Sequence, residues 1–137
     1  MRQFKLDPRL AADTVTVGTL GLCRLLLMND RRWPWLILVP QRSDVTEVHD
    51  LTPLDQTMLT FETCLVAKSL KSFCGADKIN VGALGNMVAM LHIHVIARRT
   101  GDPNWPGPVW GFGRGEPYDD PSLEKMRNDL AQAILSV

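Results

Sequence analysis

The chain has 137 residues, which is the length of one ordinary domain. Apolar residues make up 45% and charged residues 22% of the chain, a globular composition that excludes a disordered or fibrous protein. The 15 basic and 15 acidic side chains cancel, which argues against wholesale binding to nucleic acid or to an anionic membrane. We therefore expect residues 1–137 to form a single domain.

The N-terminal residues and the cysteines indicate a cytoplasmic protein. Residues 1–5 lack the apolar core of a signal peptide, and the longest apolar runs are far shorter than a membrane span. Cys23, Cys64 and Cys74 are far apart, lie in apolar surroundings and include no CxxC pair. We expect reduced and mostly buried thiols.

The first part of the chain predicts a short helix followed by a hairpin. A helix over residues 6–12 begins with an aspartate suited to capping and a proline suited to the first turn. The apolar stretch 20–28 predicts a strand, and residues 35–39, which a proline ends, predict its antiparallel partner. Residues 29–34 form the turn between them.

A long helix follows the hairpin. Thr52 and Pro53 are typical of a helix start, and Gly75 lies just past the predicted end. This helix is expected to lay one apolar face on a sheet. The residues that recur at helical spacing on that face are Leu54, Met58, Phe61, Leu65 and Phe73.

The second half predicts two more strands, over residues 78–83 and 89–98, with a turn at Gly85 and Asn86 between them. Residues 99–119 are rich in proline, glycine and tryptophan, and a loop of this length is usually functional or packs on a partner. A last helix has an apolar face formed by Leu123, Met126, Leu130 and Ile134. This order of elements predicts an α+β domain with an antiparallel sheet.

The predicted strand 89–98 carries the residues with the clearest chemistry. Side chains alternate along a strand, so Met90, His92 and His94 share one face while the apolar residues between them face the core. A neutral imidazole can attack phosphorus, and a nearby imidazolium can protonate the departing oxygen. The backbone N–H groups of the turn at Gly85 and Asn86 could cradle phosphate oxygens.

A His-x-His pair alone is a weak signal, and three interpretations remain open on spacing. The pair could be polar residues on an exposed strand, part of a metal site, or catalytic groups. His49 is the only other histidine, and no third ligand is evident near the pair, so we predict no metal site.

Residues 85–98, Gly-Asn-Met-Val-Ala-Met-Leu-His-Ile-His-Val-Ile-Ala-Arg, resemble the signature of the histidine-triad superfamily. That signature is a glycine and an amide residue, a short spacer, and then His-φ-His-φ-His-φ-φ, where φ is apolar. The resemblance extends from the first hairpin to Arg98, and it is closest to the bacterial branch labelled diadenosine tetraphosphate hydrolase-like. It implies an antiparallel sheet of about five strands, with a long helix and a C-terminal helix packed against it.

One departure from the signature bears on activity. Met90 stands where the family has the first histidine of the triad. The family's nucleophile, the middle histidine, corresponds to His92, and the last histidine, which contacts the phosphate and the leaving group, corresponds to His94. A methionine cannot replace the hydrogen bonds of an imidazole, so the resemblance implies activity that is reduced.

The resemblance also implies nucleotide-binding residues. Asn29 corresponds to a polar residue that holds the ribose hydroxyls, with Asp30 as the alternative, but both residues also favour a simple turn. The connection that follows is shorter than the family's and lacks its Pro-Gly-His element. Asn80 resembles an asparagine near the phosphates, and Asn86 an amide residue in the phosphate turn with Gly85; each asparagine could instead satisfy its own backbone.

The aromatic residues of the long loop have two possible uses. Large apolar side chains outside regular elements usually mark contact sites, and here they could close over a base or pack on a second subunit. Histidine-triad proteins are commonly homodimers, so the resemblance favours the second use. These residues are Trp105, Pro106, Trp110 and Phe112.

Together these expectations describe a nucleotide hydrolase that needs no cofactor. His92 would attack the α-phosphorus of a dinucleoside polyphosphate or a nucleoside phosphoramidate and form a nucleotidyl-histidine, while His94 helps the leaving group depart. Water would then release the nucleoside monophosphate. The alternatives are a nucleotide-binding or sensing protein with little catalysis, because of Met90, and a metal-binding strand pair.

Overall fold

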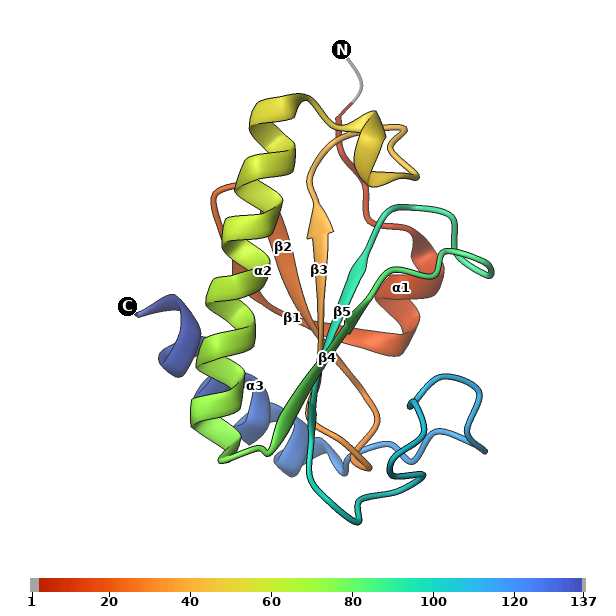
Figure 1. The fold of residues 1–137 in the computed structure, drawn as a ribbon, viewed down its shortest axis with the longest axis vertical. Coiled ribbons are helices and arrows are strands. Elements are labelled where there is room, and N and C mark those ends of the chain that lie inside the picture. The colour runs from red at the N-terminus through yellow and green to blue at the C-terminus, as the bar shows by residue number, and fades with distance from the viewer. Residues whose placement is uncertain (1–2, 137) are drawn as a thin grey trace.

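The computed structural model describes residues 3–136 and contains a five-stranded sheet in the order β1-β2-β3-β5-β4, with every neighbouring pair antiparallel (Figure 1). The elements in chain order are α1 (Pro8–Asp13), β1 (Thr14–Thr19), β2 (Cys23–Met28), β3 (Trp35–Pro40), the 3-10 helix η1 (Val48–Asp50), α2 (Pro53–Cys74), β4 (Lys78–Gly82), β5 (Ile93–Arg98) and α3 (Asp120–Leu135). The predicted α+β class and antiparallel sheet are therefore confirmed.

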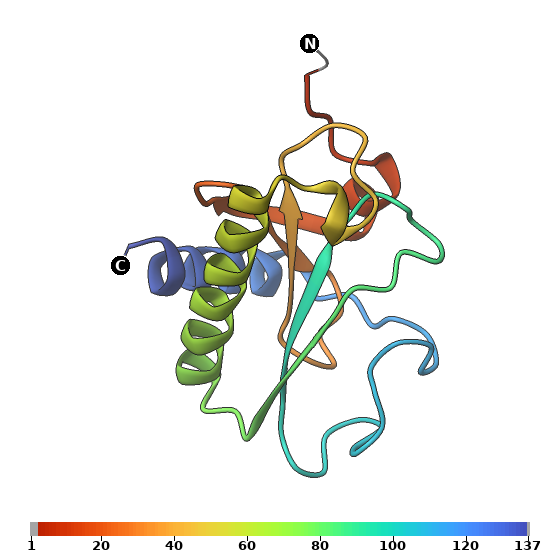
Figure 2. The same ribbon diagram turned by 45° about the horizontal axis from the view of Figure 1, so that its top comes forward.

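The sheet is covered on both faces, and each face has its own apolar cluster. Alternation along β2 and β3 sends Leu25 and Leu36 to one face, where α2 and α3 pack, and Leu26 and Ile37 to the other. That second face is covered by α1 and by the segment between β5 and α3. Figure 2 shows α2 and α3 together on one side of the sheet and that segment on the other. Since both faces are buried, β3 reads as a continuous apolar run, and β5 reads as an apolar run that His94 interrupts before it ends at Arg98.

The observed strands differ from the predicted ones at β1 and at the start of β5. The structure adds an edge strand, β1, that the sequence reasoning missed, although its Thr-Val-Thr-Val alternation is a strand signal. It follows α1 without a linker. β5 begins at Ile93 rather than at residue 89, because residues 83–92 leave the sheet. His92 therefore lies just before the strand rather than within it.

The predicted inner face of α2 is wrong. Leu54, Met58 and Phe61 are exposed, and α2 instead packs on the sheet through Leu59, Glu62, Val66 and Leu70. The helix carries apolar residues on two sides, and spacing alone does not tell which side meets the sheet. The predicted face of α3 is confirmed, since Leu130 and Ile134 are buried and Leu123 and Met126 pack against the same cluster. Within residues 3–136, no helix combines the length and apolarity that crossing a membrane requires.

Glu62 fixes α2 to the start of β2. Its carboxylate is 2% exposed and accepts hydrogen bonds from the backbone N–H groups of Leu22, at 2.8 Å, and Cys23, at 2.9 Å. Burial, together with this nearby carboxylate, raises the pKa of the Cys23 thiol. Cys74 is half-buried, but Cys64 is exposed, contrary to the expectation that the thiols would be mostly buried.

Replacing Glu62 with Ala is expected to lower the free energy of unfolding by about 2–4 kcal/mol, because two buried N–H groups lose their acceptor. Urea denaturation of the native chain and the variant measures this difference. Glu124→Ala, which removes an exposed carboxylate paired with Arg127 on α3, is the control and should change stability by less than about 0.5 kcal/mol. Equal stability of all three proteins would contradict the role given to Glu62.

Candidate functional site

His92 and His94 lie next to each other on the sheet face opposite α2 and α3. Their ring centroids are 4.8 Å apart with 65° between the ring planes. His94 is paired across the sheet with Ile37 of β3, whose side chain belongs to that face. The exposed fractions of the two histidines are 7% and 5%. The structure thus brings the two predicted catalytic residues together.

The hydrogen bond of His92 determines which of its nitrogens carries the proton. Its Nδ1 lies 2.7 Å from the carbonyl oxygen of Met90. A carbonyl oxygen only accepts, so in the neutral ring Nδ1 donates and Nε2 holds the free lone pair. An imidazole in this form can act as a nucleophile through Nε2 without first losing a proton.

His94 has the opposite arrangement. Trp35 Nε1 donates a 2.9 Å hydrogen bond to His94 Nδ1, so the proton of the neutral ring is on Nε2. Burial, and then the neighbouring His92, lower the pKa of His94 from 6.5 to about 4. Near neutral pH His94 is therefore uncharged, which does not fit the imidazolium expected from the sequence.

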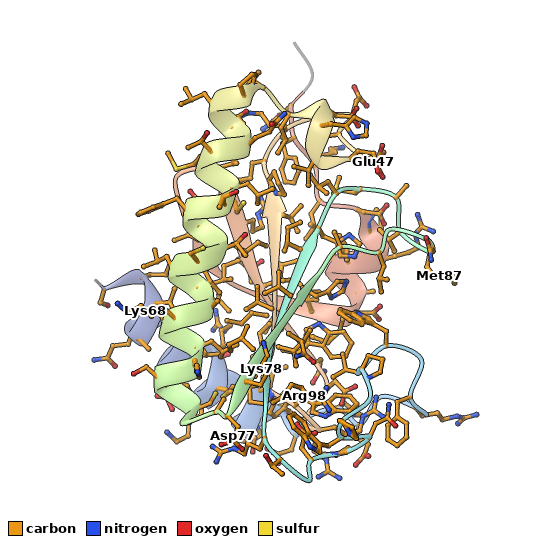
Figure 3. All side chains as sticks on the ribbon, viewed as in Figure 1. Glu47, Lys68, Asp77, Lys78, Met87 and Arg98 are labelled. Carbon is orange, nitrogen blue, oxygen red and sulfur yellow. The ribbon has the colours of Figure 1, made fainter. Side chains whose placement is uncertain are left out.

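Gly85 shares a surface hollow with His92. The hollow measures about 220 Å³, and its other lining residues are Thr46, Glu47, Val48, Ala83, Leu84 and Leu91. Gly85 has φ +74°, a left-handed conformation that favours glycine. Asn86, beside it, is exposed, and Figure 3 shows Met87 at the outer edge of the same segment. Of the two residues of the predicted phosphate turn, Gly85 is therefore the one that lines the same hollow as His92, the predicted nucleophile.

Asn29 and Asn80 do not share this hollow. The side-chain oxygen of Asn29 accepts a hydrogen bond from the backbone N–H of Tyr118 at 2.9 Å, and Asn29 lines a separate hollow of about 400 Å³ with Asp30. The side-chain oxygen of Asn80, on β4, accepts a 3.0 Å hydrogen bond from Arg98. Both side chains therefore have structural partners.

Met90 lies on the same face of the sheet as the histidines, but it does not line their hollow. It packs against the apolar cluster that contains Trp35 and Ile37, and it lines a different hollow beside Phe4 and Lys5. At this position the side chain makes apolar contacts, in place of the hydrogen bonds that an imidazole would offer.

His49, the third histidine, lies on η1 and is exposed. Within the described part of the chain, residues 3–136, His, Cys, Asp and Glu side chains do not gather in groups of three that would suit a metal ion.

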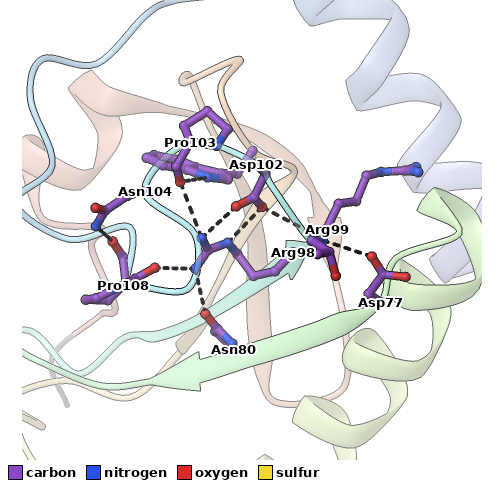
Figure 4. Close-up of polar contacts among 11 residues, drawn as sticks. Asp77, Asn80, Arg98, Arg99, Asp102, Pro103, Asn104 and Pro108 are labelled. Carbon is purple, nitrogen blue, oxygen red and sulfur yellow. Dashed lines mark hydrogen bonds and ion pairs between the residues drawn. The ribbon is translucent and has the colours of Figure 1, made fainter.

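Arg98 anchors the loop that follows β5, and the sequence reasoning missed this role. Its guanidinium donates to the Asp102 carboxylate, at 2.9 and 2.7 Å, and to the carbonyl oxygen of Gly107, at 2.9 Å (Figure 4). The guanidinium also lies over the rings of Trp33 and Trp105. Arg98 is almost completely buried, so these contacts fix the start of the loop firmly against the sheet. The sequence feature that could have indicated this role is an arginine at the end of an apolar strand.

The same loop places Trp110 against His94. The ring centroids are 5.4 Å apart and nearly perpendicular, and the Trp110 indole nitrogen is buried without a hydrogen-bond partner in the described structure. Gly82 makes room for this ring, because a Cβ there would lie 3.0 Å from Trp110 Cη2. Trp110 thus packs against the candidate site, and closure of the loop aromatics over a base stays a prediction.

Comparison with known proteins identifies the family. A model of the HIT domain matches residues 9–101, which is more than half of the chain. The chain therefore belongs to the HIT domain family.

Solved structures agree with this assignment. The chain is 63% identical to a histidine triad protein of Sinorhizobium meliloti 1021, with TM-score 0.92 over 95% of this chain and 96% of that one. A histidine triad protein of Marinobacter aquaeolei VT8 is 44% identical, with TM-score 0.95 over 98% of each chain. One of Bradyrhizobium japonicum is 41% identical, with TM-score 0.93 over 97% of this chain and 99% of that one. Among proteins with curated functions, none matches.

The lowered pKa of His94 predicts a pH-dependent stability. Between about pH 6.5 and pH 4, unfolding lets His94 take up a proton, so the free energy of unfolding falls as the pH drops through this window. The loss between pH 7 and pH 5 should be about 2 kcal/mol. Urea denaturation of the native chain and of His94→Gln at both pH values isolates this contribution. The variant should lose correspondingly less, and equal losses would contradict the buried neutral histidine.

Proposed function

We propose that this HIT protein hydrolyses nucleotides at the α-phosphate through a nucleotidyl-histidine intermediate on His92. The observation that carries the proposal is the hydrogen bond of His92 Nδ1 to the Met90 carbonyl, because it leaves the Nε2 lone pair available beside the N–H of His94. Membership of the HIT domain family supports a nucleotide ligand. The substrates considered are dinucleoside polyphosphates and nucleoside phosphoramidates, as in the diadenosine tetraphosphate hydrolase-like branch.

In the first step, His92 Nε2 donates its lone pair to the α-phosphorus. The bond between phosphorus and the leaving group breaks, and its electron pair stays on the leaving group. The ring becomes cationic, and its Nδ1–H remains bonded to the Met90 carbonyl, which stabilises this charge. In the second step, water attacks the phosphorus and loses a proton to the solvent, the N–P electrons return to Nε2, and the nucleoside monophosphate departs. His94 donates a hydrogen bond to the reacting phosphate from Nε2.

The nucleotide contacts remain predictions. We propose that the backbone at Gly85 and Asn86 receives phosphate oxygens in the hollow beside His92. The side-chain oxygens of Asn29 and Asn80 are used within the protein, so their contacts with ribose or phosphate would come from the side-chain NH₂ groups.

The alternative function is nucleotide binding without turnover. The observation that favours it is the apolar position of Met90, which supplies no imidazole where the histidine triad has its first one. This alternative predicts that the protein binds a nucleoside monophosphate but releases none from longer nucleotides.

Turnover of diadenosine tetraphosphate in excess chelator separates these functions. The native chain is expected to release adenosine monophosphate, and His92→Ala should lower the rate by about 10³-fold or more because the nucleophile is lost. His49→Ala, which changes an exposed histidine on η1, is the matched control and should keep the native rate. Binding of the monophosphate without turnover would favour the alternative, and full activity of His92→Ala would refute the proposed nucleophile.

We also propose that the chain forms a homodimer through the outer face of α2. Leu54 and Phe61 are 75% and 64% exposed, and with Met58 and Leu65 they form an apolar row along one side of the helix. A row without charge is self-complementary, so the same row of a second copy can cover it across a two-fold axis. The free thiols are compatible with the predicted cytoplasmic location.

Phe61→Glu should convert the dimer to a monomer, because association would bury two carboxylates in an apolar interface. Light scattering coupled to gel filtration measures the molar mass. Lys71→Glu, at an exposed position of α2 away from the row, should leave the dimer intact. A monomeric native protein at micromolar concentration would exclude this interface.

A further inference from the structure

Trp35 is held in place beside His94 from several directions. It begins β3, where it pairs with Ile96 of β5, and its side chain is buried. The ring of Trp33 contacts it edge-on, with centroids 6.2 Å apart. The indole N–H therefore has a fixed direction, toward His94 Nδ1 at 2.9 Å.

The chemistry of the indole restricts where His94 can carry a proton. An indole N–H only donates, so Nδ1 of His94 must accept. A second proton on Nδ1 would point two N–H donors at each other with no acceptor between them. The other ring contacts of His94 are with Trp110 and His92, neither of which supplies a negative charge to stabilise an imidazolium. His94 can thus donate a hydrogen bond from Nε2 while it keeps the proton.

We propose that Trp35 is a positioning residue that holds His94 as a neutral hydrogen-bond donor, and that the site consequently takes nucleotides whose leaving group departs as a phosphate anion. This inference rests on the proposed function for its substrate class. It distinguishes dinucleoside polyphosphates from nucleoside phosphoramidates, both of which the proposed function includes as substrates.

The two classes differ in their need for a proton. When His92 Nε2 bonds to the α-phosphorus of a phosphoanhydride, the P–O bond breaks and its electron pair stays on the leaving oxygen. The product is a phosphate anion, which is stable without a proton from His94. When a phosphoramidate reacts, the P–N electron pair would create an amide anion, which is too basic to leave. Its nitrogen must first take a proton, and a His94 that retains its own does not supply it.

Two matched variants isolate the indole N–H. Trp35→Phe keeps an aromatic ring in the apolar cluster but removes the donor to His94. Trp33→Phe keeps an aromatic ring against Trp35 but removes the Trp33 indole N–H, which donates to the carbonyl oxygen of Pro103 at 3.0 Å rather than to His94. Both variants lose one hydrogen bond donated by an indole N–H, so a purely structural effect should appear in both.

Nitrogen-15 NMR of the histidine rings at pH 7 tests the assignment directly and does not require activity. In the native chain and in Trp33→Phe, His94 should show an unprotonated Nδ1 and a protonated Nε2. In Trp35→Phe this pattern should give way to exchange between forms. A protonated Nδ1 in the native chain, or an unchanged pattern in Trp35→Phe, would overturn the proposal.

The ratio of kcat/KM for diadenosine tetraphosphate to that for adenosine 5′-phosphoramidate tests the substrate class. Acid catalysis typically contributes 10²–10⁴-fold, so the native ratio should be about 10² or more. The ratio should fall about tenfold or more in Trp35→Phe and stay native in Trp33→Phe. Equal values for the two substrates in the native chain would overturn the proposal. No turnover of either substrate, with the expected NMR pattern, would contradict the proposed function and uphold the assignment of Trp35 and His94.

Discussion

β3 and β5 lie side by side at the centre of the sheet, and their antiparallel register determines where the candidate site forms. Pairing Ile37 with His94 places the histidine on the face away from α2 and α3, and it brings Trp35 within hydrogen-bond reach. A shift of one residue would turn His94 into the apolar cluster beneath α2, where no partner for its nitrogens is expected. The residues buried on both faces of these strands therefore stabilise this register as well as the fold.

The loop between β5 and α3 completes the site because buried polar contacts hold it. Arg98 binds the first turn of the loop through Asp102 and a later part of it through Gly107, and the loop brings Trp110 back to the ring of His94. The two indoles around His94 keep water and charge away from the ring, which keeps the histidine neutral. His92 lines the hollow together with Gly85, and it is the imidazole that we propose contacts a ligand.

Local patterns in the sequence were sufficient for part of this structure. Capping residues predicted α2, apolar residues at helical spacing predicted α3, and two apolar runs separated by a turn predicted the β2–β3 hairpin. The His-x-His alternation predicted that the two histidines lie together. The outer and inner faces of α2 could not be distinguished, because both are apolar and only packing selects one. The roles of Trp35 and Arg98 depend on contacts across the sheet and with the loop. Trp35 and His94 are 59 positions apart in the chain, and no local spacing relates them.

The proposed hydrolysis requires that His92 forms a covalent bond to the nucleotide. The stereochemistry at phosphorus tests it most directly, using hydrolysis of a nucleotide with a chiral α-thiophosphate in ¹⁸O-labelled water. Attack by His92 followed by attack by water inverts the phosphorus twice, so we expect net retention of configuration. Net inversion would mean that water attacks the substrate directly, and it would contradict the role assigned to His92.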